Sequence, residues 1–186
     1  MRANFVTIHG IDGTGKSTIA NQLAELLNAQ GHLAVFYDNL VKEIGDLPNT
    51  GGGLFDGKIQ QSGIISRALA DGQTVSRDRW LIDIFASETF KGEQLSLVPK
   101  EILRPDLSVI LLCEESVRQS RIRLRSNPTI DDLTPKVEGT RPDYFEKYLL
   151  KHIANFAACS LVLDTTHNDP KQATAKIIAE LEKGEK

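Results

Sequence analysis

Short apolar runs alternate along the chain with longer segments of mixed polarity. The runs at 33–37 and 107–113 are almost wholly apolar, those at 4–9 and 160–164 carry three apolar residues each, and 74–77 is a short strand candidate that ends at Asp78-Arg79. Runs of this kind are typical of parallel strands that are buried on both faces. Five strands separated by helices predict an α/β fold, with a parallel sheet and helices on both of its faces.

The segments between these runs repeat their apolar residues at helical spacing. Ile19, Leu23, Leu26 and Leu27 form one stripe and predict a helix over 16–29. Further helices are predicted over 58–70, 80–90, 115–125, 143–158 and from 170 onward. Two polar stretches are left over. We predict that 38–57 is mostly loop and that 126–141 is a mobile lid.

Length and composition predict a single domain spanning residues 1–186, with 40% hydrophobic and 25% charged residues. The net charge of −3 argues against a nucleic-acid partner, which would favour a basic face. No apolar stretch approaches the roughly 20 residues that span a bilayer, and no signal peptide is evident. Cys113 and Cys159 are expected to be buried thiols. These features predict a soluble cytoplasmic protein without a membrane partner.

A glycine-rich loop follows the first predicted strand. The octapeptide Gly10-Ile11-Asp12-Gly13-Thr14-Gly15-Lys16-Ser17 fits the phosphate-binding pattern G-x-x-x-x-G-K-[ST], and a predicted helix follows it. The glycines let successive N–H groups point at an anion, and the helix N-terminus favours negative charge. Lys16 is predicted to act on the β- and γ-phosphates of ATP, and Ser17 to bind Mg²⁺. The ATP site is predicted to comprise Gly10, Asp12, Gly13, Thr14, Gly15, Lys16, Ser17 and Thr18.

Four segments follow one another in the order of a known family: 5–18, the triplet Asp78-Arg79-Trp80, 104–121 and 161–167. They resemble the thymidylate kinase family of nucleoside-monophosphate kinases, whose third strand ends in Asp-Arg-Tyr. The resemblance implies a P-loop kinase three-layer sandwich, ATP and Mg²⁺ as cofactors, a nucleotide acceptor and a homodimer. It also implies that Asp12 lies near the acceptor sugar and that Thr166 belongs to the loop at the adenine.

The acceptor half departs from this pattern. The family has Arg-Glu-Pro-Gly-Gly after its second strand, which helps to hold the acceptor phosphate. Here residues 37–41 read Tyr-Asp-Asn-Leu-Val and contain no arginine. The family's phenylalanine and arginine for the pyrimidine have no clear equivalents at 59–62. The acceptor is therefore left open.

The loop after the third predicted strand supplies the groups expected at the acceptor, because ligands in such sheets bind beyond the carboxyl ends of the strands. We predict that Asp78 holds the metal's water shell or the acceptor. Arg79 is predicted to grip a phosphate with its forked guanidinium; a surface ion pair is the alternative. Trp80 has two interpretations, a ring that stacks on the acceptor or a core residue.

The catalytic cation is predicted to come from the lid. Gly13 offers no charge, whereas Arg121 and Arg125 are four residues apart on one predicted helix face. Both are predicted to enter the site when the lid closes, with Arg118 and Arg141 as further candidates. A solvated basic face is the alternative for each arginine.

Three functions remain open at this stage. The leading hypothesis is an ATP-dependent nucleoside-monophosphate kinase in which Lys16, Asp78, Arg121 and Arg125 are catalytic. A nucleoside, sugar or other small-molecule kinase on the same scaffold is the second. A nucleotide-dependent switch ATPase is the third, since residues 110–115 form an apolar strand followed by an acidic pair.

Overall fold

All five predicted strands form one parallel sheet. The computed structural model describes residues 2–44, 55–95 and 98–183. The strands are β1 (Phe5–His9), β2 (Ala34–Phe36), β3 (Thr74–Asp78), β4 (Leu107–Leu112) and β5 (Cys159–Asp164). Their order in the sheet is β2-β3-β1-β4-β5. The central strand β1 is buried at every residue, including the polar Thr7 and His9, as expected for a parallel strand that is covered on both faces.

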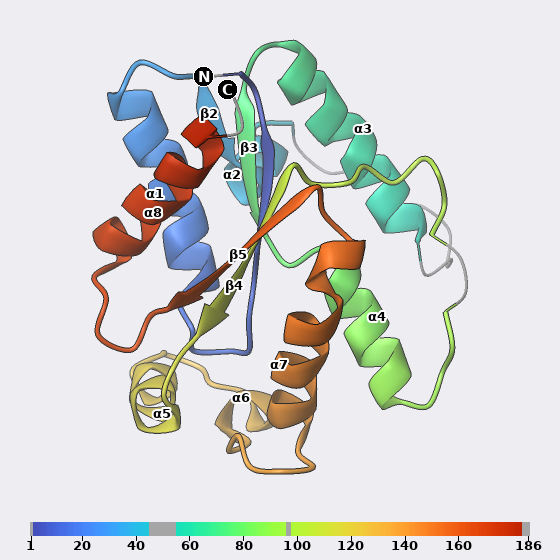
Figure 1. Ribbon diagram of the computed structural model, residues 1–186, viewed down its shortest axis with the longest axis vertical. Helices are drawn as coiled ribbons and strands as arrows, with labels where there is room; N and C mark the ends of the chain where they lie inside the picture. The colour runs from blue at the N-terminus through green and yellow to red at the C-terminus, as the bar shows by residue number, and fades with distance from the viewer. Residues whose placement is uncertain (1, 45–54, 96–97, 184–186) are drawn as a thin grey trace.

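Helices cover both faces of this sheet (Figure 1). They are α1 (Lys16–Ala29), α2 (Tyr37–Ile44), α3 (Asp56–Ala70), α4 (Leu81–Phe90), α5 (Glu115–Arg123), α6 (Ile130–Leu133), α7 (Arg141–His152) and α8 (Pro170–Lys183). The pair α1 and α8 packs together on one side, and α3, α4 and α7 lie on the other. The predicted three-layer sandwich is thereby confirmed. No helix among the described residues is long and apolar enough to cross a membrane.

The strand ends place the functional loops along one edge of the sheet. In the parallel register, Ile8 of β1 pairs with Asp78 of β3 and with Val109 of β4. The glycine-rich loop after β1 therefore lies between the loops after β3 and β4. Helices α5 and α6 lie beyond this edge, at the bottom of Figure 1.

Residues 38–44 correct the prediction that 38–57 is mostly loop, because they belong to the helix α2, which begins at Tyr37, the predicted end of the second strand. Tyr37 is buried in the cluster on the α3 side, and Leu40 and Val41 pack against it. These three residues have the i, i+3, i+4 spacing of one helix face, and their packing stabilises a turn-rich sequence as helix. The part of the predicted loop at 45–54 lies outside the described residues.

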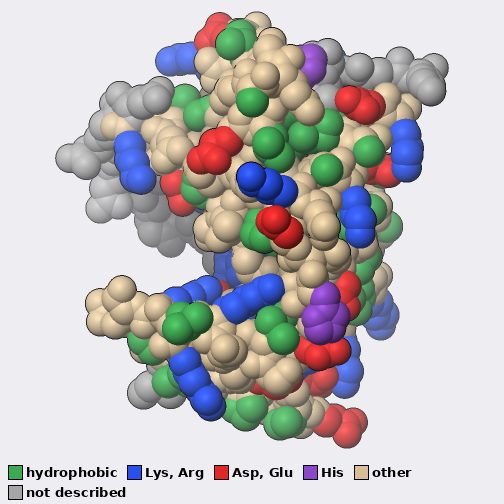
Figure 2. Space-filling model, turned by 90° about the vertical axis from the view of Figure 1, so that its left-hand side faces the viewer, with side chains coloured by type: hydrophobic (Ala, Val, Ile, Leu, Met, Phe, Trp, Pro, Cys, Tyr) green, Lys and Arg blue, Asp and Glu red, His purple; other side chains and the backbone are tan. Residues whose placement is uncertain are grey.

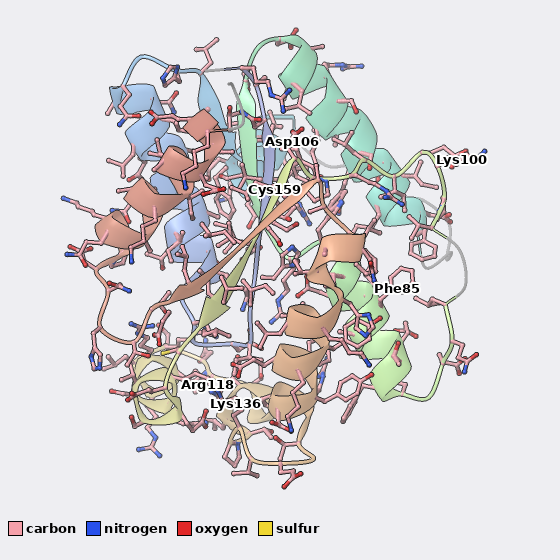
Figure 3. The ribbon with its side chains drawn as sticks, viewed as in Figure 1. Phe85, Lys100, Asp106, Arg118, Lys136 and Cys159 are labelled. Carbon is pink, nitrogen blue, oxygen red and sulfur yellow. The ribbon has the colours of Figure 1, made fainter. Side chains whose placement is uncertain are left out.

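One of the two cysteines also departs from prediction. Cys113 is buried, but Cys159 is exposed. Cys159 begins β5, which forms an edge of the sheet, and its backbone N–H donates to the Asp106 carbonyl (Figure 3). An edge strand of this kind lacks cover on part of its length, so its apolar run does not guarantee burial.

Candidate active site

The glycine-rich loop uses backbone conformations that favour glycine. Gly10, Gly13 and Gly15 have φ angles of 145°, 89° and 94°. A Cβ on Gly10 would lie 2.7 Å from the Leu111 carbonyl oxygen, and one on Gly13 would lie 2.7 Å from Cγ of Arg118. Side chains at these positions would therefore force the loop away from β4 and α5.

Lys16 lies folded along this loop. Its side chain is 6% exposed, and its Nζ donates to the Ile11 carbonyl at 3.0 Å and to Asp12 at 3.4 Å. Burial lowers the pKa of Lys16, and the charge of Arg79 lowers it further. The ammonium of Lys16 thus lies at the loop, and Asp12 is its only carboxylate partner among the described residues. A ligand with more negative charge than this carboxylate would bind the ammonium more strongly.

Ser17 and Asp78 meet across the gap between α1 and β3. The Ser17 hydroxyl donates a short hydrogen bond to Oδ2 of Asp78. Mg²⁺ at nucleotide sites is usually bound by one or two protein groups, with phosphates and waters completing its octahedron. A hydroxyl and a carboxylate side by side at the loop fit that pattern. No cluster of three or more metal-ligating side chains occurs among the described residues.

Asp12 and Arg79 form the wall beside this pair. Nη2 of Arg79 donates to Oδ1 of Asp12 at 2.5 Å. Burial raises the pKa of Asp12, but the charges of Lys16 and Arg79 outweigh it and hold the pKa at about 2. Arg79 has a φ of 58°, a left-handed conformation that is costly for a residue other than glycine. Its N–H donates to the Ile8 carbonyl at 2.9 Å, which holds this turn against β1.

A buried histidine supports the loop from below. Nδ1 of His9 lies 2.6 Å from Oδ2 of Asp83, and Nε2 lies 2.8 Å from the Thr7 hydroxyl. The same Asp83 oxygen accepts the Trp80 N–H at 3.0 Å. Burial raises the pKa of Asp83, but His9 and Arg79 outweigh burial and lower it. Asp83 therefore fixes the start of α4 beneath the site, a role that its position in the sequence did not reveal.

Three adjoining cavities follow the loop. The base-side cavity is lined by Gly13, Thr18, Arg121, Arg125, Thr165 and Asn168. The central cavity is lined by Asp12, Lys16, Ser17, Asp78, Arg79 and Arg125. The lid-side cavity is lined by Asp12, Arg79, Arg118, Thr134, Arg141 and Phe145. Neighbouring cavities share wall residues, so the three adjoin one another in a row, which we call the path along the loop. Figure 2 shows the surface hollowed on one side, with Lys and Arg side chains along the border of the hollow.

Arg121 lies at the base-side end of this path. Its guanidinium donates to the Thr165 carbonyl at 2.7 Å and to the Thr165 hydroxyl at 3.2 Å. The Thr165 hydroxyl also donates to the carbonyl of Thr14, tying the loop after β5 to the glycine-rich loop. Thr166 does not line the cavity; its hydroxyl accepts the Glu114 N–H at 2.9 Å. Thr165 is therefore the residue of this loop that faces the cavity, and a role of Thr166 at the adenine stays a prediction.

Arg125 and Arg118 have different surroundings, although both lie on or just after α5. Arg125 lines the base-side and central cavities, and its Nη1 donates to Asp132 at 3.0 Å. Arg118 is fully buried; it binds both Glu115 oxygens, at 2.6 and 2.8 Å, and donates to the carbonyl of Asp12 at 3.1 Å. Arg118 also donates to the carbonyl of Thr134 at 2.6 Å. It therefore connects the glycine-rich loop to the predicted lid.

The predicted lid is held in place by further contacts. The Lys136 N–H donates to Glu115 at 3.1 Å, and its Nζ forms an ion pair with Glu146 at 2.9 Å. Arg118 and Lys136 lie next to each other in this region (Figure 3). That this segment opens and closes, and that the whole chain is one kinase domain, remain predictions.

Trp80 belongs to the core. It is 1% exposed, its ring packs edge-on against Phe5 with centroids 5.1 Å apart, and its Nε1–H donates to the Leu103 carbonyl at 2.9 Å. Of the two interpretations from the sequence, the structure favours the core residue over an open stacking surface.

Known proteins resemble this chain along most of its length. A protein from Thermococcus onnurineus named probable thymidylate kinase is 30% identical over 199 residues, which cover 89% of this chain and 94% of that protein. The chain belongs to the thymidylate kinase family. A probable thymidylate kinase from Archaeoglobus fulgidus is 27% identical and covers 94% of both chains. No protein-family model matches the chain.

A solved structure agrees with this fold. The crystal structure of thymidylate kinase from Ehrlichia chaffeensis aligns with a TM-score of 0.54 and 18% identity, over 98% of this chain and 100% of that one. Membership of the thymidylate kinase family makes this protein a phosphotransferase similar to nucleoside-monophosphate kinases.

Proposed function

We propose that this thymidylate kinase family member transfers the γ-phosphoryl group of MgATP to the phosphate of a nucleoside monophosphate. The observation that supports this most is the central cavity, where Lys16, the Ser17–Asp78 pair and the Asp12–Arg79 pair face one another. Phosphoryl transfer needs positioning and positive charge more than covalent chemistry. These groups supply both around one space.

The donor nucleotide would extend along the path from the base-side to the central cavity. The base would lie beside Arg121 and Thr165, and the triphosphate would follow the N–H groups of the glycine-rich loop. The four N-terminal N–H groups of α1 have no acceptor within the helix, so they are free for phosphate oxygens. Lys16 would leave the Ile11 carbonyl for the β- and γ-phosphates.

Ser17 and Asp78 would hold Mg²⁺, directly or through its waters. When bound, the ion neutralises charge that develops between the β- and γ-phosphates. Asp12 keeps Arg79 oriented, and Arg79 would receive the acceptor phosphate with its remaining donors. Arg125, at the junction of two cavities, is the proposed lid cation closest to the transferred group, whereas Arg121 is proposed to orient the donor base.

The relatives indicate the class of the phosphoryl acceptor but do not identify the acceptor of this chain. The relatives are named thymidylate kinases, but this chain lacks the Arg-Glu-Pro-Gly-Gly segment that helps to hold the acceptor phosphate in the family, so the acceptor has to be identified by experiment. The experiment is a coupled assay of ATP consumption with a panel of nucleoside monophosphates, nucleosides and phosphorylated metabolites. We expect a nucleoside monophosphate to accelerate ATP consumption strongly. Acceleration by a nucleoside or sugar alone would indicate the small-molecule kinase, and acceptor-independent hydrolysis would indicate the switch ATPase.

The homodimer that the family resemblance implies also remains a prediction.

Replacement of Arg79 by alanine tests the acceptor assignment. Arg79→Ala removes the guanidinium but leaves Lys16 and the glycine-rich loop in place, so the KM of the acceptor should rise at least tenfold. The KM of ATP should change about twofold or less. Steady-state kinetics with each substrate varied in turn measures both. An equal rise in the two KM values would place Arg79 on the triphosphate side instead.

A further inference from the structure

Two cations on the α3 side of the sheet are left without a carboxylate partner. Arg77 is on β3, one residue before Asp78, and Lys58 is in the first turn of α3. Neither side chain forms an ion pair within 4.0 Å among the described residues. Nε and Nη1 of Arg77 are buried and donate to no partner there. Buried polar groups are nearly always hydrogen-bonded, so these donors call for an explanation.

Aromatic rings hold the two cations close to each other. The Arg77 guanidinium lies 3.9 Å from the centroid of the Tyr37 ring and 5.5 Å from that of Trp80. The Lys58 ammonium lies 4.6 Å from the centroid of the same Trp80 ring. Tyr37 is 3% exposed, and its hydroxyl has no hydrogen-bond partner within 3.5 Å in the described structure, although it lies close enough to the Arg77 guanidinium to raise the pKa of Arg77. The positively charged Arg77 and Lys58 and the hydroxyl of Tyr37 therefore lie around one small region.

Burial and mutual repulsion disfavour the charged forms of Arg77 and Lys58, and nearby carboxylates offset only part of this effect. Burial lowers the pKa of Lys58 to about 8, and the charge of Arg77 lowers it further, against the effect of Asp83 and Asp78. Burial likewise lowers the pKa of Arg77, against the effect of Tyr37, Asp38 and Asp78. A bound anion would relieve both the repulsion and the lack of partners.

Arg77 directly precedes Asp78, which lines the central cavity. Side chains of consecutive strand residues point to opposite faces, so Arg77 faces α3 while Ser76 donates to the Ala20 carbonyl of α1. Consecutive Cα atoms are about 3.8 Å apart, which places the base of the Arg77 side chain next to Asp78 and Arg79. The two cations are therefore on the α3 face of the sheet, one residue from Asp78 along β3 and close to Tyr37, which follows β2, where the family arginine is missing.

We infer that Arg77 and Lys58 form an anion-binding subsite that receives the phosphate monoester of the acceptor, with Tyr37 as a further hydrogen-bonding group. This inference rests on the proposed function. A phosphate monoester bears about −1.5 to −2 charges at neutral pH and three acceptor oxygens, which matches a guanidinium and an ammonium together. In this chain, cations on β3 and α3 would supply the charge that the family takes from the segment after its second strand.

The first test measures phosphate binding without catalysis. Melting temperatures are recorded with increasing inorganic phosphate, against chloride at equal ionic strength, in a Lys16→Ala background that weakens the glycine-rich loop. Phosphate should raise the melting temperature of this background. Addition of Arg77→Met or Lys58→Met should abolish most of that rise, whereas Arg67→Met, an exposed charge on the same α3, should leave it unchanged. An undiminished rise in the Arg77→Met protein would overturn the inference, whatever the enzymatic acceptor is.

The same variants separate a ligand site from a structural role. If the cations await a ligand, Arg77→Met and Lys58→Met should melt at the same temperature as wild type or higher when no phosphate is present. A structural clamp between Tyr37 and Trp80 predicts the opposite, a clear fall in melting temperature, and that result would count against the subsite.

The second test uses the acceptor found by the assay above. Arg77→Met and Lys58→Met should each raise its KM at least tenfold, with the KM of ATP changed twofold or less and Lys58→Arg close to wild type. Equal rises for both substrates, or an unchanged acceptor KM, would overturn the inference. If no acceptor accelerates ATP consumption in the wild type, the proposed function fails, and the inorganic phosphate titration still decides whether the anion subsite exists.

Discussion

Lys16→Ala should lower the turnover number by about a hundredfold or more without unfolding the protein. Loss of one preorganised charge at a transition state typically costs a factor of 10² to 10³. Here the charge is buried at the glycine-rich loop, where low dielectric strengthens its effect on the phosphates. Because burial lowers the pKa of Lys16, its removal also relieves an unfavourable charge in the empty protein. The melting temperature should therefore change little.

The measurement is a coupled kinase assay at saturating ATP and acceptor, with thermal melting of the same samples. Lys176→Ala, an exposed lysine on α8, provides the matched control and should behave as wild type. More than a tenth of the wild-type turnover in Lys16→Ala would contradict the role assigned to Lys16, since a tenfold loss is only ~1.4 kcal/mol of barrier.

Arg118→Met should have the largest effect on stability. The guanidinium of Arg118 is fully buried and joins Glu115, the carbonyl of Asp12 and the carbonyl of Thr134. Removing one partner of a buried pair costs about 3–5 kcal/mol. Glu115 is 29% exposed and can regain water, so we expect a loss of about 2–4 kcal/mol. For a chain of this length, that corresponds to roughly 5–15 °C in melting temperature.

Urea unfolding and thermal melting measure this loss. Arg123→Met is the control, because Arg123 is an exposed arginine on the same helix; it should change the free energy of unfolding by about 0.5 kcal/mol or less. Turnover of Arg118→Met, measured well below its melting temperature, should also fall because the lid loses its link to the glycine-rich loop. Equal stability of the two variants would show that Arg118 does not connect these segments.

The sequence determined the scaffold and the donor half of the site. Apolar runs such as 107–113 predict buried parallel strands because a strand covered on both faces tolerates few polar residues. The octapeptide from Gly10 to Ser17 predicts a phosphate loop because its chemistry is local: glycine conformations, one lysine and one hydroxyl within eight residues. The loop after β3 could be placed at the same edge because the ends of parallel strands meet there.

Tertiary structure decided what the long side chains do. The sequence does not distinguish the three arginines on and after α5. In the structure Arg118 is buried under the loop, Arg121 donates to Thr165, and Arg125 lines the central cavity. An arginine reaches several ångströms from its backbone, so its role depends on which distant carbonyls and carboxylates the fold brings near.

The acceptor half depended on packing for the same reason. Helix α2 forms because Tyr37, Leu40 and Val41 find a core to cover, although the composition of the segment favours a loop. Arg77 and Lys58 are 19 positions apart in the printed sequence, and no spacing rule connects them. They meet over the Trp80 ring only because α3 packs on β3, so the sequence could show that a family arginine was missing but not which cations would lie near its place.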